Sequence, residues 1–141
     1  MNIARNLGIL LLLCYVATGC NQKSPTQPAK GFLHTLWTLE SFSINGDIVK
    51  APESQSFTIK FKEDNRFSGQ SDCNSIGGAY KINENYALVI SEAGTTEVGC
   101  GPKSMGDVYF QALIAAKSFE ITKNTLTIFY AEKSRLVFTY E

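Results

Sequence analysis

Residues 69–80 read GQSDCNSIGGAY, and the rest of the chain is organised around this stretch. It contains three of the eleven glycines and a cysteine, Cys73, between two segments in which apolar and polar residues alternate. Glycine enters positive φ without steric cost, and Asp72 and Asn74 can bond their own backbone in a turn. The composition therefore predicts a sharp, closely packed crossing of the backbone rather than a random loop.

Alternation on both sides of this stretch predicts short antiparallel strands. Residues 56–62 place Phe57, Ile59 and Phe61 on one face, which is the period of a half-buried strand. The Asn-Gly pair at residues 45–46 indicates a tight hairpin turn. Strands are expected at residues 36–42, 48–49, 56–62, 66–71, 78–83, 86–92, 119–121, 126–130 and 135–140.

A helix is expected late in the chain, because the apolar period changes from two to three and four. Ser104 can cap this helix, with Asp107 completing a capping box. The predicted apolar stripe consists of Met105, Val108, Tyr109, Ala112, Leu113 and Ala116.

The predicted fold class is mainly β. We expect a small antiparallel, β-barrel-like meander of about eight strands, with one α-helix inserted before the last strands, since curling removes exposed strand edges. A barrel of about eight strands holds either side chains or one small ligand, and the sequence leaves both open.

The N-terminus has the layout of a bacterial lipoprotein signal peptide. Arg5 supplies a positive start, residues 7–16 form an apolar run, and small residues precede Cys20. The run is well short of the ~20 residues that a membrane-spanning helix needs. Because Val-Ala-Thr-Gly-Cys resembles a lipobox, we expect residues 1–19 to be removed and Cys20 to carry lipid. A plain secretory signal before an ordinary thiol is the alternative.

The remaining chain divides into a tether and one domain. Residues 21–31 are polar and contain Pro25 and Pro28, so residues 20–32 are expected to form a lipidated flexible tether. Residues 33–141 are expected to form a single domain. Removing residues 1–19 takes one basic residue from 13 and none of the 13 acidic ones, so the net charge becomes −1. This balance argues against a nucleic-acid partner.

Cys73 and Cys100 are left to pair, because Cys14 lies in the signal run and Cys20 is expected to carry lipid. Thiols oxidise outside the cytoplasm, so we expect a disulfide between them, with Cα atoms within ~7 Å. The alternatives are two separate buried thiols and a reactive thiol. The latter needs an activating base, and His34 is the only histidine.

Residues that could support catalysis are scarce. Asp72 and Asn74 have the alternate spacing of a Ca²⁺ loop, but the bidentate acid of such a loop is missing. Gly77 and Gly78 lack the lysine and the following helix of a phosphate-binding loop. We therefore expect no catalytic residue, no metal and no cofactor.

The order of these motifs resembles the META domain of HslJ-like bacterial lipoproteins. The similarity rests on RFSGQSDCN at residues 66–74, GAY at residues 78–80, and Thr95-Thr96 with Cys100. It implies a small β-barrel-like fold with a helix and no established enzymatic activity. Cys73 and Cys100 would be the family's paired positions. The other motif residues would be structural: Gly69, Ser71, Asp72, Asn74, Gly78 and Tyr80. Many members have glycine at the position of Asp72.

Members of this family are envelope or secreted proteins linked to heat stress, novobiocin resistance and, in some lineages, motility or virulence. The resemblance implies a place in the cell envelope. Together with the lipobox and the lack of a catalytic constellation, it predicts a non-enzymatic, lipid-anchored cell-envelope protein that acts in stress tolerance or as an interaction module. An apolar-ligand carrier and an inhibitor of a cell-wall-degrading enzyme are the alternatives. The expected contacts are the membrane, through lipid on Cys20, and either an envelope protein or a small apolar ligand. Asn21 stands where enteric bacteria use aspartate for inner-membrane retention, which favours the outer membrane.

Overall fold

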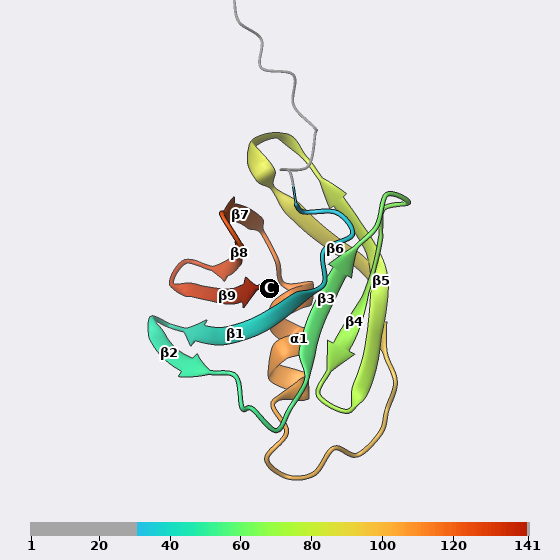
Figure 1. Ribbon diagram of the computed structural model, residues 1–141, viewed down its shortest axis with the longest axis vertical. Coiled ribbons are helices and arrows are strands. Elements are labelled where there is room, and N and C mark those ends of the chain that lie inside the picture. Colours follow the sequence, from blue (N-terminus) through green and yellow to red (C-terminus); the bar gives the residue numbers. More distant parts are fainter. Residues whose placement is uncertain (1–30, 141) are drawn as a thin grey trace, which may run out of the picture.

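The computed structural model describes residues 31–140, which contain nine β-strands and one α-helix. In chain order the elements are β1 (Trp37–Ile44), β2 (Asp47–Lys50), β3 (Phe57–Phe61), β4 (Arg66–Ser71), β5 (Asn74–Ile82), the short 3₁₀ helix η1 (Glu84–Tyr86), β6 (Leu88–Thr95), α1 (Gly106–Ile114), β7 (Ser118–Thr122), β8 (Thr125–Ala131) and β9 (Ser134–Thr139). The predicted mainly β fold with one helix before the last strands is confirmed (Figure 1).

The strands form one antiparallel, curled sheet in the order β6-β5-β4-β3-β1-β9-β8-β7, and β2 pairs with β1. The first strand therefore lies in the middle, between the meander β3 to β6 and the meander β7 to β9. The outer strands approach each other at a bridge between Ala87 and Ser118, where the N–H of Leu88 donates to the carbonyl of Lys117 at 2.9 Å. The helix α1 packs against β4, β6, β8 and β9, strands of both meanders (Figure 1).

Aromatic rings fill the interior of the curled sheet. Phe32 is fully buried, and its ring centroid lies 4.2 Å from that of Phe61 and 4.6 Å from that of Phe119. The indole N–H of Trp37 donates to the carbonyl of Phe32 at 3.4 Å. The predicted tether includes residue 32, whereas the structure places Phe32 in the core, because burying its ring among other rings is strongly favourable.

Residues 69–80 form part of a regular hairpin, which corrects the expected irregular crossing. β4 and β5 pair in register up to Ser71 and Asn74, and a two-residue turn joins them. Asp72 occupies the left-handed region in this turn, with a φ of 58°. Turn chemistry was therefore correctly predicted at Asp72, but the neighbouring residues continue the two strands.

Two glycines in this hairpin are required by close packing rather than by positive φ. A Cβ atom on Gly69 would overlap the carbonyl oxygen of Thr58 in β3. A Cβ atom on Gly78 would come within 2.9 Å of both the Cα of Ala93 and the carbonyl oxygen of Ser91 in β6. Each glycine thus allows a neighbouring strand to approach.

The helix is confirmed, but its start and its buried face differ from the prediction. It begins at Gly106, and Met105 at the cap position has no capping side-chain hydrogen bond, so the predicted capping box is not formed. The hydroxyl of Ser104 nevertheless accepts a hydrogen bond from the N–H of Gly106 at 3.1 Å. Val108 was expected in the apolar stripe but is 41% exposed. The buried positions are Gly106, Tyr109, Ala112 and Leu113, because the sheet covers only one narrow side of this short helix.

Candidate functional site

The cysteines and the turn residues of the motif gather at one end of the β4–β5 hairpin. Residues 96–105, which we call the 96–105 loop, connect β6 to α1 and return to this end of the hairpin. Cys73, in the turn, and Cys100, in the loop, form a disulfide with Cα atoms 5.6 Å apart. This separation is within the predicted limit of ~7 Å. The bond ties the loop to the hairpin.

The side-chain amide of Asn74 provides a second link to the 96–105 loop. Its Oδ1 accepts hydrogen bonds from the N–H of Val98 at 2.7 Å and from the hydroxyl of Thr96 at 2.9 Å. Its Nδ2 donates to the carbonyl of Val98 at 3.0 Å and contacts the sulfur of Cys100 at 3.2 Å. All four hydrogen-bonding positions of the amide are therefore used.

Gln55 holds the other end of the loop, immediately before α1. Its Nε2 donates to the carbonyl of Lys103 and its Oε1 accepts from the N–H of Met105, both at 2.9 Å. The buried hydroxyl of Ser71 donates to the carbonyl of Gly106 at 2.7 Å. The loop is thus held at its beginning, middle and end by side chains from other elements.

The surface of the 96–105 loop is exposed and nearly neutral. Residues 96–99 and 101–103 are all exposed, and Val98 has 58% of its surface exposed. Glu97 and Lys103 are the charged side chains of the loop, and they offset each other. The loop therefore presents an apolar side chain on a backbone that is held in place.

Tyr80, by contrast, lies far along β5 from the disulfide, so the structure does not bring all motif residues together. Its hydroxyl donates to the carbonyl of Lys62 at 2.7 Å. Burial raises the pKa of Tyr80 above its ordinary value, and the charge of Asp64 adds to the shift. Tyr80 stays neutral at physiological pH and serves as a core and hydrogen-bonding residue.

In the described part of the chain, the histidine and the carboxylates do not converge on a reactive centre. His34 is exposed, and its Nε2 lies 3.2 Å from a carboxylate oxygen of Glu63, which is also exposed. Within residues 31–140, no group of three or more His, Cys, Asp or Glu side chains could hold a metal ion. The same residues include no helix long and apolar enough to cross a membrane. Cys20, the expected lipid site, lies outside the described residues.

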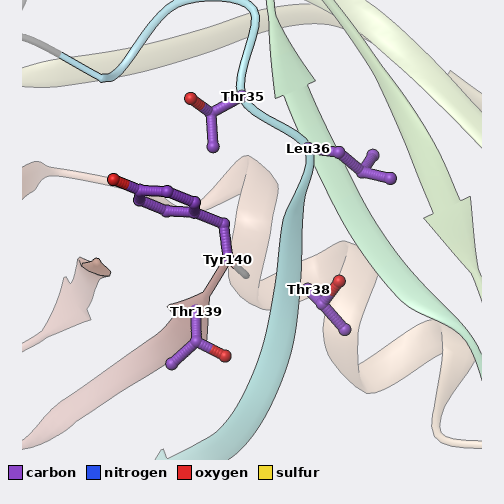
Figure 2. A pocket seen from close by; sticks show the side chains of 5 residues that line it. All are labelled: Thr35, Leu36, Thr38, Thr139 and Tyr140. Carbon is purple, nitrogen blue, oxygen red and sulfur yellow. The ribbon is translucent and has the colours of Figure 1, made fainter.

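A groove of about 540 Å³ lies where the start of β1 meets the end of β9. Figure 2 shows the side chains that line it. Its lining residues are Thr35, Leu36, Thr38, Thr139 and Tyr140. Thr35 and the Tyr140 ring lie on one side of the β1 segment, and Leu36 lies on the other (Figure 2). The Tyr140 ring packs edge-on against the buried Trp37, with centroids 5.0 Å apart. The groove is open to solvent and lies outside the aromatic interior, so its side chains do not enclose a ligand.

The sequence missed two residues that shape these features, Gln55 and Phe32. Gln55 is a single glutamine before a strand, and no local pattern marks it. Phe32 follows Gly31 directly after the proline-containing polar segment, so an aromatic residue at the end of a polar run was the available signal.

Comparisons with known proteins agree with this fold. The profile of the META domain matches residues 30–141. An NMR structure of a protein from Burkholderia xenovorans has a TM-score of 0.68 at 16% identity, covering 100% of this chain and 99% of the other. A second NMR structure has a TM-score of 0.61 at 24% identity, covering 82% and 96%. The crystal structure of a DUF4847 family protein from Bacteroides vulgatus has a TM-score of 0.58 at 17% identity, covering 79% and 96%.

No curated protein matches the chain in sequence. The three structural similarities lie below 25% identity, so they concern the fold alone. The profile match extends over most of the chain and includes the hairpin, the disulfide and the 96–105 loop. The chain belongs to the META domain family.

Proposed function

We propose that this protein is a non-enzymatic lipoprotein of the bacterial envelope, anchored in the outer membrane through Cys20, whose META domain is an interaction module in stress tolerance. The observation that carries the proposal is that the motif side chains bind other parts of the same protein. Asn74 and Ser71 bond the protein's own backbone, and Cys73 is in a disulfide. The residues most specific to the family therefore build a rigid surface and are not free for chemistry.

The aromatic interior supports an interaction module over a ligand carrier. Phe32 contacts Phe61, Phe119 and Tyr80, with ring centroids between 4.2 and 5.8 Å apart. A carrier needs a concave apolar pocket that encloses most of its ligand. The rings occupy the space that such a ligand would need. An inhibitor of a cell-wall-degrading enzyme remains the second candidate, favoured by the fastened and exposed 96–105 loop.

Anchoring is tested by fractionating cells that produce the full-length chain or a cysteine variant. We expect Cys20→Ser to release the protein from the membrane fraction, because a serine cannot receive the thioether-linked lipid. Cys14→Ser is the matched control, since it changes a cysteine of the same segment, and we expect it to remain with the membrane. Unchanged membrane association of Cys20→Ser would contradict the anchor.

The non-enzymatic assignment is tested with the purified mature chain. We expect no turnover of peptidoglycan, peptides or phosphate esters. A turnover that disappears when one polar cluster is mutated, while the variant keeps its melting temperature, would overturn the assignment.

A further inference from the structure

We infer that the 96–105 loop is a preorganised docking element, which presents the side chain of Val98 to a small apolar pocket of a partner protein. This inference rests on the proposed interaction function and gives it a surface. Four observations carry it: the exposure of Val98, the fastening of its backbone, the position of the loop in the molecule and the near absence of net charge.

The backbone and the side chain of Val98 face different environments. Its N–H and its carbonyl both bond the amide of Asn74, at 2.7 and 3.0 Å. Its isopropyl group is 58% exposed. A partner can therefore recognise the side chain, while the polar backbone groups of this residue are already satisfied.

The disulfide and the hydrogen bonds that hold the 96–105 loop lower the entropic cost of binding a partner. Fixing a loop in its bound shape before the encounter removes part of the ordering that association otherwise requires. The Cys73–Cys100 disulfide, the Asn74 amide and the Gln55 amide each hold a different part of the 96–105 loop.

The loop lies at the end of the domain opposite the chain entry. Phe32 packs against Phe61, and the N–H of His34 donates to the carbonyl of Phe61, at the far end of β3 from the hairpin turn. β5 leads from Asn74 to Ile82, about 25 Å at a rise of ~3.3 Å per residue. Figure 1 shows the segment before α1 at the bottom of the molecule and the start of the described chain at the top. A domain tethered by its N-terminus presents this loop away from its anchor.

The chemistry of the loop favours a protein with an apolar pocket as its binding partner. The charges of Glu97 and Lys103 offset each other, so the loop has no cluster of basic residues and no net positive charge to attract anionic lipids or nucleic acid. Substrate-like protease inhibition is also disfavoured. A loop bound in that way lies in the active site as an extended strand, and it offers its central N–H and carbonyl to the enzyme. In Val98 both groups are bonded to Asn74.

The test is photo-crosslinking from the full-length protein in the cells that produce it. The probe is p-benzoylphenylalanine at position 98, with matched probes at Ile48 and Val108, which are 67% and 41% exposed. We expect one discrete protein adduct from position 98 and not from the control positions. We also expect the yield of this adduct to fall when Asn74→Ala releases the loop, although position 98 stays exposed.

A binding measurement with the identified partner completes the test. We expect Val98→Lys to weaken the affinity about tenfold or more, as loss of an anchoring side chain does. We expect Ile48→Lys to leave it within about twofold, since surface residues outside the contact are near neutral. Unchanged melting temperatures would show that both variants are folded.

The inference is overturned if position 98 gives no adduct, if the control positions give the same adduct, or if Val98→Lys binds as tightly as the wild type. An adduct to lipid alone would also overturn it, because it would make the loop a membrane contact. Failure of the anchor is separate. If Cys20→Ser stays in the membrane fraction but the position 98 adduct forms, the anchor is wrong and the docking loop stands. If Cys20→Ser leaves the membrane fraction but position 98 gives no adduct, the lipid anchor is supported and the docking loop is wrong.

Discussion

The side chain of Asn74 holds the backbone of Val98, 24 residues away, by two hydrogen bonds. Oδ1 accepts from the Val98 N–H at 2.7 Å, and Nδ2 donates to the Val98 carbonyl at 3.0 Å. Because one partner is a donor and the other an acceptor, this pair fixes the orientation of the amide. A side chain that both donates and accepts is therefore required at position 74.

Replacing Asn74 by Asp tests this requirement. The carboxylate can still accept from Val98, but it places a negative oxygen against the Val98 carbonyl. We expect Asn74→Asp to lower the free energy of unfolding by about 1–3 kcal/mol, measured in urea at pH 7. Asn124→Asp is the control, since the side chain of Asn124 makes one long hydrogen bond, from its Nδ2 to the carbonyl of Tyr140 at 3.4 Å. An equal loss in both variants would argue against a specific role for Asn74.

Removal of the disulfide should loosen one region before the others. For a cross-link between cysteines 27 residues apart, the chain-entropy model predicts a loss of about 3–4 kcal/mol. We expect the double variant Cys73→Ser, Cys100→Ser to exchange amide hydrogens faster in residues 96–105 than in β1, β8 and β9, measured by mass spectrometry. Uniform acceleration would contradict a local role, and two titratable thiols in the oxidised, denatured domain would exclude the disulfide.

Gly69 and Gly94 form a matched pair for testing close packing. A methyl group on Gly69 would overlap the carbonyl of Thr58, while one on Gly94 would meet nothing within 4 Å. We expect Gly69→Ala to cost about 1–3 kcal/mol or more, and Gly94→Ala to change stability by less than about 0.5 kcal/mol. Thermal unfolding of both variants measures the difference. A neutral Gly69→Ala would show that β3 and β4 can separate without cost.

Phe32 decides where the ordered core begins. We expect Phe32→Ala to lower the free energy of unfolding by about 3–5 kcal/mol, because it removes a fully buried ring that stacks on Phe61. Leu36→Ala is the control on the same segment, since Leu36 is 56% exposed, and its cost should stay below about 0.5 kcal/mol. If the two variants are equally stable in urea, Phe32 belongs to the tether as the sequence predicts.

Tyr109 should make the domain sensitive to alkali. Complete burial raises the pKa of Tyr109 far above its ordinary value, and its hydroxyl donates to the carbonyl of Thr58 at 3.0 Å. The unfolded chain ionises near pH 10 and the folded chain does not. The stabilising contribution is therefore complete below about pH 10 and is lost as the pH rises above it.

Tyr109→Phe isolates this contribution. At pH 7 it should cost about 0.5–1.5 kcal/mol for the lost hydrogen bond. Above about pH 10 its stability should fall less steeply than that of the wild type, measured by urea unfolding between about pH 8 and 11. Parallel pH profiles would assign the alkaline loss to other groups.

The strands with clear alternation and the position of the helix could be predicted from the sequence. Phe57, Ile59 and Phe61 are buried on one face of β3, and Asn45 and Gly46 make the turn between β1 and β2. These features follow from the geometry of neighbouring residues, which a period of two or a turn pair reports directly. The Cys73–Cys100 pair also followed from the sequence, because few cysteines were left to pair.

The contacts between distant segments could not be predicted from the sequence, because they depend on the arrangement of the strands and the helix in space. Sequence periodicity does not reveal that Gln55 and Asn74 hold the 96–105 loop, since these bonds depend on where β3, β5 and α1 lie in space. The same reason explains the regular hairpin at residues 69–80. Gly69 and Gly78 are needed there because adjacent strands pack closely against them, and neither lies in the turn. It also explains Phe32, whose burial depends on rings that come from β3, β5 and β7.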